Sequence, residues 1–162
     1  MHDIIIVGGG PAGLTAAIYG LRAGKSVLVI EKNGFGGQIA YSPKVENIPG
    51  TIQISGAEFA DRLLEQAISL GAYMEMENVT GNEKVIPVDG VFLAVGLMPE
   101  NEPFGHLAYL NDWGYFDSQE DCRTATEGLF VAGDCRSKRI RQVVTASADG
   151  AVAAMAACAY LD

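Results

Sequence analysis

The sequence predicts an α/β fold class, a doubly wound, Rossmann-like parallel sheet with helices on both faces and a short β-hairpin at about residues 73–88. Fully apolar short runs, typical of parallel strands covered on both faces, occur at residues 4–7, 27–30, 91–96 and 129–132. Glycine supplies 20 of the 162 residues, well above the usual share of roughly 7%. The glycines stand at junctions between elements, and a chain of this length fits one domain.

The first unit of the chain is a strand, a loop, a helix and a second strand. The apolar run 4-IIIV-7 leads into 8-GGGPAG-13, and helix signals continue from about Pro11 to Ala23, with Gly24 as the C-cap. The second strand, 27-VLVI-30, ends in an acidic residue. A glycine motif between a strand and a helix, with an acid at the end of the next strand, is typical of dinucleotide binding.

Each residue of this motif has a physical role in such a site. Gly8 permits the tight turn, Gly10 lets a pyrophosphate approach the backbone, and Gly13 lets the helix pack closely on the strand. Unpaired N–H groups at the helix N-terminus face the phosphate. Glu31 would bond the adenosine ribose hydroxyls and disfavour a 2′-phosphate. The alternative is a merely tight βα turn in a nucleotide-free α/β domain.

The middle of the chain begins with a long glycine-rich loop at residues 34–50, and such loops are usually functional in compact domains. A helix is expected from about Ser55, with Glu58 completing a capping box, to Gly71. Residues 72–88 then predict a hairpin, because an alternating strand is followed by the turn 80-TGN-82 and a second short apolar run.

The last part of the chain contains two more buried strands and a long helix. Residues 97–125 between the strands are rich in loop signals, with one short hairpin expected around Gly114. The strand at 129–132 leads into Gly133 and Asp134. A final helix is expected from about Arg139 to Tyr160.

Composition narrows the function classes. The net charge of −9 argues against binding nucleic acid or an anionic membrane. The longest apolar stretch, 151–161, is shorter than a membrane span, and no secretory signal is recognised. We therefore expect a cytoplasmic protein. With two histidines and no metal-ligand spacing among the cysteines, no metal site is expected.

The three cysteines form no C-x-x-C motif. Cys158 stands among small helical residues and is expected in the core, whereas Cys122 falls in a loop and is expected to be exposed. Cys135 follows Gly133-Asp134; a packed thiol is expected there rather than a reactive one.

Taken together, the motifs identify a family. The chain resembles the FAD domain of the low-molecular-weight thioredoxin reductases, in two blocks that cover nearly all of it. Residues 1–78 carry 8-GGGPAG-13, 36-GGQ-38 and 46-ENIPG-50, and residues 84–162 carry 90-GVFLAVG-96, 127-EGLFVAGDC-135 and 141-RQVVTA-146. The resemblance implies FAD as the cofactor.

The resemblance also implies roles for individual residues. The matches of Gln38, Ile39 and Asn47 line the isoalloxazine, that of Asp134 bonds the ribityl chain, and 141-RQV-143 opens the last helix under the flavin. The full set of expected cofactor-binding residues is Gly8, Gly10, Pro11, Ala12, Gly13, Glu31, Lys32, Gly36, Gly37, Gln38, Ile39, Asn47, Val79, Gly133, Asp134, Arg141, Gln142, Val143 and Ala146. A helix N-terminus with a nearby arginine also stabilises the negative charge of a reduced flavin.

The chain departs from this family between its two blocks. The family inserts there a second dinucleotide-binding domain, which binds NADPH and usually carries a redox C-x-x-C. Here only a few residues around 78-NVTGNEK-84 separate the blocks, and the sequence has no second G-x-G-x-x-G. We therefore expect residues 1–162 to form a single FAD-binding domain, its two blocks joined by a short hairpin linker, with the NADPH and dithiol domain missing through natural or engineered deletion.

Three functions remain open at this point. The first is a minimal FAD-binding flavoprotein whose flavin is redox-active but which has no complete thioredoxin-disulfide reductase activity of its own and no catalytic side chain. The second is a flavin subunit whose electron donor or dithiol domain arrives in trans. The third is a non-catalytic scaffold. A homodimer through the flavin domain is also expected. The basic run 136-RSKRIR-141 is either a solvated helix start or a surface for FAD or an acidic partner.

Overall fold

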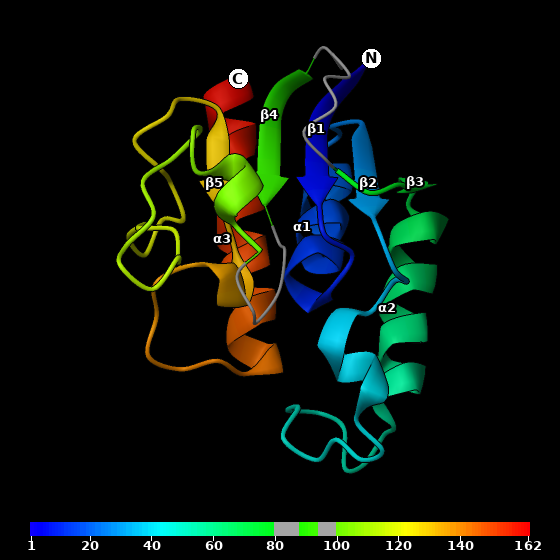
Figure 1. The fold of residues 1–162 in the computed structure, drawn as a ribbon. Coiled ribbons are helices and arrows are strands. Elements are labelled where there is room, and N and C mark those ends of the chain that lie inside the picture. Colours follow the sequence, from blue (N-terminus) through cyan, green and yellow to red (C-terminus); the bar gives the residue numbers. More distant parts are fainter. Residues whose placement is uncertain (80–87, 94–99) are drawn as a thin grey trace.

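The computed structural model describes residues 1–79, 88–93 and 100–162. The elements, in chain order, are β1 (His2–Val7), α1 (Pro11–Arg22), β2 (Val27–Glu31), η1 (Gly37–Tyr41), α2 (Gly56–Ser69), β3 (Tyr73–Met76), β4 (Val88–Leu93), η2 (Glu102–Phe104), β5 (Leu129–Val131), η3 (Gly133–Cys135) and α3 (Val143–Leu161) (Figure 1). The η elements are short 3-10 helices.

The strands form one parallel sheet in the order β3-β2-β1-β4-β5. The first strand, β1, lies in the middle because Ile4 pairs with Val27 on one side and with Gly90 on the other. Its isoleucines are buried, as expected for a strand covered on both faces. The predicted Rossmann-like α/β fold is confirmed.

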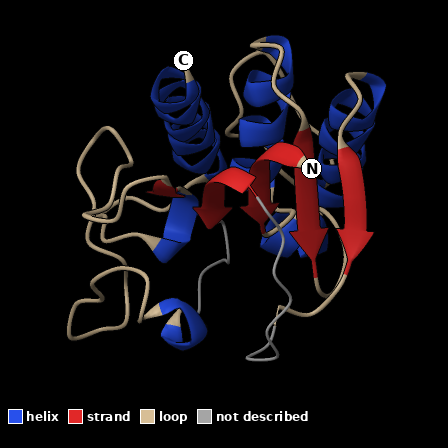
Figure 2. Cartoon of the chain, turned by 90° about the horizontal axis from the view of Figure 1, so that it is seen from above, coloured by secondary structure: helices blue, strands red, loops and turns tan. Residues whose placement is uncertain are grey.

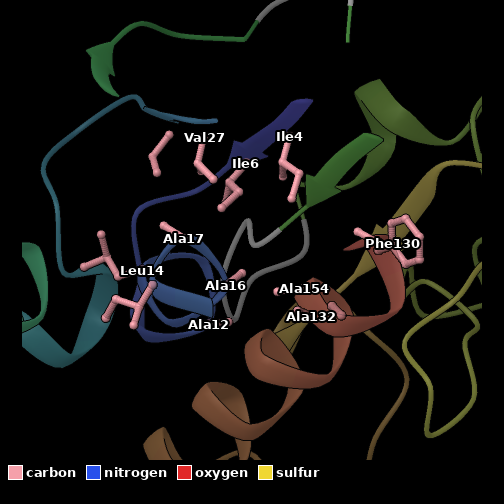
Figure 3. Packing of buried hydrophobic residues seen from close by; sticks show 14 of the residues in the cluster. Ile4, Ile6, Ala12, Leu14, Ala16, Ala17, Val27, Phe130, Ala132 and Ala154 are labelled. Carbon is pink, nitrogen blue, oxygen red and sulfur yellow. The ribbon is translucent and has the colours of Figure 1, made fainter. Parts of the chain in front are cut away.

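All three α-helices lie on one face of this sheet (Figure 2). The side chains of Ile4, Ile6 and Val27 point toward α1 and form the main core with it (Figure 3). On the opposite face, Phe116 and Ala108 from the long loop segment pack with Leu129 and Val131. The expectation of helices on both faces is therefore wrong for the described residues. The segment 100–128 supplies turns and a 3-10 helix there, because its Gly, Pro, Asn and Asp residues interrupt any helical period.

The predicted hairpin at about 73–88 is only partly described. Its first arm is a strand, β3, but β3 pairs in parallel with β2 at the edge of the sheet. Residues 80–87, which include the predicted turn and most of the second arm, lie outside the described residues. Val88 begins β4, which runs parallel to β1.

The two small-residue helices α1 and α3 pack closely. A Cβ atom on Gly150 would lie 2.1 Å from the carbonyl oxygen of Ala12, so only glycine fits at this crossing. On α3, Ala153, Ala154 and Ala157 are completely buried. By length and composition alone α3 could cross a membrane; its packing on α1 and the sheet instead fits a core helix. It begins at Val143, four residues later than predicted, because Gln142 is its N-cap.

Candidate functional site

A cavity of about 750 Å³ is lined by residues at the carboxyl ends of β1, β2 and β5, where open α/β sheets bind their ligands. Figure 1 shows these strand ends on the same edge of the sheet. The cavity volume falls within the roughly 300–1,000 Å³ typical of small-molecule sites. Of the predicted residues, the cavity is lined by Gly8, Gly10, Pro11, Ala12, Glu31, Lys32, Gly37, Gln38, Ile39, Val79, Gly133, Asp134, Arg141, Gln142, Val143 and Ala146. Gly13, Gly36 and Asn47 are not part of this lining.

The first wall is the loop between β1 and α1, which exposes backbone to the cavity. Gly8 adopts φ 107°, which glycine tolerates and other residues rarely do. Gly10 is the N-cap of α1 and gives it no side-chain cap, and the first turn of α1 contains no acidic residue. The first N–H groups of α1 therefore have the arrangement that binds an anion.

The glycines of this loop differ in what surrounds them. A Cβ on Gly10 would have no atom closer than 3.9 Å, so the open space beside it belongs to the cavity. A Cβ on Gly13 would lie 1.9 Å from the carbonyl oxygen of Gly8, which fits its expected role in close packing of helix and strand.

Glu31 closes this wall at the end of β2. One carboxylate oxygen accepts the N–H of Gly9 at 2.7 Å, and the other accepts the N–H of Asn33 at 3.0 Å. These two bonds fix the carboxylate beside the glycine loop. The neighbouring Lys32 forms an exposed ion pair with Glu100, across the mouth of the cavity.

A second glycine-rich turn packs against the first. The N–H of Gly36 donates to the carbonyl of Gly9 at 2.7 Å, and a Cβ on Gly37 would lie 3.1 Å from the Cα of Gly10. This contact brings Gln38 and Ile39 of η1 into the cavity wall.

The second wall comes from the second half of the chain, where Asp134 lines the cavity between β5 and α3. Its Oδ1 atom is buried and has no hydrogen-bond partner among the described residues. Burial raises the pKa of this carboxyl group, while Lys138 and Arg141 lower it. A buried acceptor without a partner, on a residue that lines a cavity, fits a ligand that carries hydroxyl groups, as the ribityl chain of FAD does.

The start of α3 also faces the cavity. Gln142 forms a capping box with Thr145, and its side-chain oxygen accepts a 2.9 Å hydrogen bond from Asn47. Asn47 thus supports the lining although it does not form it. The guanidinium of Arg141 lies over the ring of Tyr115, 4.3 Å from its centroid.

The basic run 136–141 divides: Arg139 is exposed and Arg141 lines the cavity, whereas Arg136 and Lys138 match neither interpretation that the sequence left open. Arg136 and Lys138 are mostly buried, and both pair with Asp149 of α3, at 2.9 Å and 2.7 Å. These two ion pairs therefore tie the segment before α3 to α3 itself. The sequence did not reveal these ion pairs, because their shared partner Asp149 lies more than one turn inside an otherwise apolar helix.

The three cysteines are all buried. This confirms the expectation for Cys135 and Cys158, whereas the expected exposure of Cys122 is wrong. Cys122 packs under α3, and burial raises the pKa of its thiol to about 11. Such a thiol is a poor nucleophile at neutral pH. In the part of the chain that the structure describes, no cluster of His, Cys, Asp and Glu could hold a metal ion.

Several cavity residues were not predicted from the sequence: Val7, Ile30, Asn33, Gly34, Tyr41, Ser42, Glu77, Asn78, Glu100, Pro103, Phe104 and Ala132. Many of them directly follow strand ends, and that position was the available signal. Pro103 and Phe104 come from the loop segment after β4, where no periodic pattern marks them.

Comparisons with known proteins agree with this geometry. The family described as pyridine nucleotide-disulphide oxidoreductase matches residues 64–150, and the family described as FAD binding domain matches residues 3–78. The thioredoxin reductase of Bacillus subtilis (strain 168) is 30% identical over 162 residues, which cover 99% of this chain and 51% of that protein. A protein of Clostridium pasteurianum named "34.2 kDa protein in rubredoxin operon" is 33% identical, over 98% of this chain and 51% of its own length. The chain thus spans about half the length of these curated relatives.

Solved structures show the same fold. The thioredoxin reductase of Lactococcus lactis has a TM-score of 0.87 at 19% identity, with 99% of each chain covered. The thioredoxin reductase of Gloeobacter violaceus has a TM-score of 0.91 at 18% identity, with 99% of this chain and 95% of that chain covered. At these identities the likeness shows the fold alone. The predictions of the family and of FAD as the cofactor are confirmed by the family and sequence matches.

Proposed function

This chain belongs to the pyridine nucleotide-disulphide oxidoreductase family, as an FAD-binding domain of the thioredoxin reductase type, and we propose that it is a minimal flavoprotein whose bound FAD exchanges electrons without a nicotinamide site of its own. The observation that carries this proposal is the one cavity lined by both sequence blocks, with residues 8–12 on one side and residues 133–143 on the other. Neither block alone would enclose it.

In this proposal the two ends of the cavity hold different parts of FAD. The N-terminus of α1 binds the pyrophosphate beside Gly10, and Glu31 binds the adenosine ribose. Asp134 accepts hydrogen bonds from the ribityl hydroxyls. Gln38, Ile39 and the start of α3 at Gln142 contact the isoalloxazine. The unpartnered Oδ1 of Asp134 and the uncapped N-terminus of α1 support these assignments.

FAD would supply reversible one- and two-electron chemistry. The protein contributes charge and shape around it: the N-terminus of α3 and Arg141 favour negative charge on a reduced ring. The ring of Tyr115 packs against the guanidinium of Arg141 and helps to hold it in place. We name no catalytic side chain, since the described cysteines are buried and the sequence contains no C-x-x-C.

We also propose that residues 1–162 act as one domain, with the two blocks joined directly where the family carries its NADPH domain. Supporting this, β3 and β4 flank the short segment 77–87 and belong to one sheet. By themselves these residues should not catalyse NADPH-dependent reduction of a disulfide.

A second candidate is a flavin subunit whose electron donor arrives in trans. It is favoured by exposed apolar side chains on the loops next to Tyr115 and Arg141, where Trp113 is 78% and Ile140 63% exposed. A hydrogen bond from Asn111 to Ser137 joins these two loops. A homodimer is compatible with either candidate, because α3 also exposes Val152 and Met155.

The test is an anaerobic visible spectrum of the FAD-reconstituted protein, before and after NADPH and then dithionite. We expect a flavin band that NADPH leaves unchanged and dithionite bleaches. The thioredoxin reductase of Bacillus subtilis serves as the positive control for NADPH. Bleaching by NADPH alone would replace the proposal with a minimal reductase, and the lack of a flavin band after reconstitution would leave only the scaffold.

A further inference from the structure

One mostly buried acid on α3 lies outside the cavity lining and touches the turn that carries Asp134. Asp149 is 13% exposed at its side chain, and its carboxylate has three partners. Its Oδ2 accepts the N–H of Gly133 at 3.1 Å and the Nζ of Lys138 at 2.7 Å, and its Oδ1 accepts from Arg136 at 2.9 Å.

These partners bracket Asp134 in the chain. Gly133 precedes it by one residue, and Arg136 and Lys138 follow it by two and four. A single carboxylate on a rigid helix thus holds both ends of the turn formed by η3. Gly133 adopts φ +81°, and a Cβ there would lie 2.9 Å from the Cβ of Ala12, so the turn has little room to shift toward α1.

Asp134 needs such support because its own side chain does not provide it. Its Oδ1 atom is buried and has no partner among the described residues, so no hydrogen bond of that atom fixes its direction. The direction of the Asp134 carboxylate then depends on the backbone of the turn. The later part of the turn has further anchors, since Phe116 pairs with Cys135 and Asn101 donates to the carbonyl of Cys135. At the start of the turn, the N–H of Gly133 goes to Asp149.

Arg136 extends the same network away from the cavity. It is 5% exposed, and its second nitrogen donates to the carbonyls of Gln119 at 2.6 Å and Ser118 at 3.4 Å. Loss of Asp149 would leave two mostly buried cations without their shared partner, and charges left in this way force local rearrangement.

We infer that Asp149 is a positioning residue for the cofactor site, which fixes the turn of Gly133 to Lys138 so that the Asp134 carboxylate points at the bound FAD. The inference rests on the proposed contact between Asp134 and FAD. Through that turn, a residue outside the lining sets how well the site accepts the ribityl hydroxyls.

The test is a double-mutant cycle on FAD affinity, measured by quenching of flavin fluorescence on titration of the apo-protein. We expect Asp149→Asn to weaken FAD binding about 10-fold in the wild-type background, as loss of charge-assisted hydrogen bonds does. In the Asp134→Ala background the same change should weaken binding by less than about 2-fold, since no carboxylate is left to position. The exposed pair of Arg123 and Asp121 gives the control: Asp121→Asn should leave the affinity unchanged.

A pH profile adds a readout that a purely structural role would not move. The charged groups acting on Asp134 are Lys138, Arg141 and Asp149, and the negative charge of Asp149 raises its pKa. In Asp149→Asn, the acid limb of FAD affinity should therefore shift to lower pH. An unshifted limb would count against the inference.

The outcomes separate the inference from the proposed function. Equal weakening by Asp149→Asn in both backgrounds would overturn the inference alone, because it would indicate general destabilisation. Full FAD affinity in Asp134→Ala would overturn the contact with FAD, and the inference with it. If Asp149→Asn does not fold, Lys138→Gln removes one of the two ion pairs and should weaken binding about 3-fold, only while Asp134 is present.

Discussion

The two walls of the cavity are built in different ways. The wall from the first block, residues 8–13, presents backbone: glycines, an uncapped helix N-terminus and a carboxylate bonded to the loop itself. The wall from the second block, residues 133–142, presents side chains held by partners elsewhere in the same block, such as Asp149 and Tyr115. A wall made of backbone tolerates almost no added atoms, whereas a wall made of side chains is sensitive to charge.

The largest effect that would sharpen this comparison is expected at Gly13. Gly13→Ala places a methyl group 1.9 Å from the carbonyl oxygen of Gly8, so α1 must move away from β1. We expect a loss of about 3–5 kcal/mol in the free energy of unfolding, the range of severe packing changes. Urea denaturation of the apo-protein measures it.

The matched control lies in the same helix. A Cβ on Gly20 would contact the side chains of Ile4 and Val27 at 3.2 Å, and these can adjust. Gly20→Ala should change stability by less than about 1 kcal/mol, because the gain in helix propensity offsets the crowding. Equal losses at both positions would show that the first wall has no special dependence on backbone approach.

A substitution at Gly10 should weaken FAD binding much more than it lowers the stability of the apo-protein. A Cβ there would lie 3.9 Å from its nearest non-neighbouring atom, the Cα of Gly37, and a side chain built on it would enter the cavity. Gly10→Val should therefore weaken FAD binding by about 100-fold or more, equal to about 2.7 kcal/mol. The apo-protein should lose only about 1 kcal/mol from the poorer N-cap.

FAD titration and thermal melting of the same apo-samples measure the two effects. Ala57→Val, at an exposed position of α2, is the control for an added branched side chain. Unchanged FAD affinity in Gly10→Val would break the assignment of this wall to the pyrophosphate.

The residues of both walls were predictable from the sequence, those of the second through the family resemblance, but the partners that hold the second wall were not. The spacing 8-GGGPAG-13 between two apolar runs and Glu31 specifies a local unit, whose parts lie within about 30 residues of one another. Asp149 and Tyr115 act on residues 133–141 only after the chain has folded, and nothing in their neighbours marks them. The placement of all three helices on one face was likewise hidden, because apolar strands read the same whether helices or loops cover them.

Charge gives the next effect, at Asp134. Burial raises the pKa of this carboxyl group above its ordinary value of 3.8, so the charged form destabilises the folded apo-protein at neutral pH. The penalty fades as pH falls through the folded pKa toward 3.8, because the folded protein then binds the proton more tightly than the unfolded chain. Asp134→Asn should therefore stabilise the apo-protein at pH 7 by about 1 kcal/mol, raising its Tm by about 2–4 °C.

This gain should shrink as the pH is lowered toward 4, while FAD affinity falls in the same variant. Differential scanning calorimetry between pH 4 and 8 follows the first, and FAD titration the second. Asp112, an exposed carboxylate, provides the control variant Asp112→Asn. If Asp134→Asn lowered the Tm of the apo-protein at neutral pH, the second wall would not owe its properties to a buried charge.

The smallest effect should appear where the two walls meet. Asn47 donates a 2.9 Å hydrogen bond to Gln142, and this bond links the loop after η1 to the N-cap of α3. The bond is solvent-exposed, so its net worth is about 0.5 kcal/mol. Asn47→Ala should weaken FAD binding about 2-fold and leave the melting temperature of the apo-protein within about 2 °C of the wild type. Gln142→Ala should do more, since it also removes the capping box with Thr145 at the start of α3. Equal effects of the two variants would mean that the hydrogen bond between Asn47 and Gln142, and not the helix cap, shapes the flavin end of the cavity. The contact between the two walls would then matter as much as the structure of either wall.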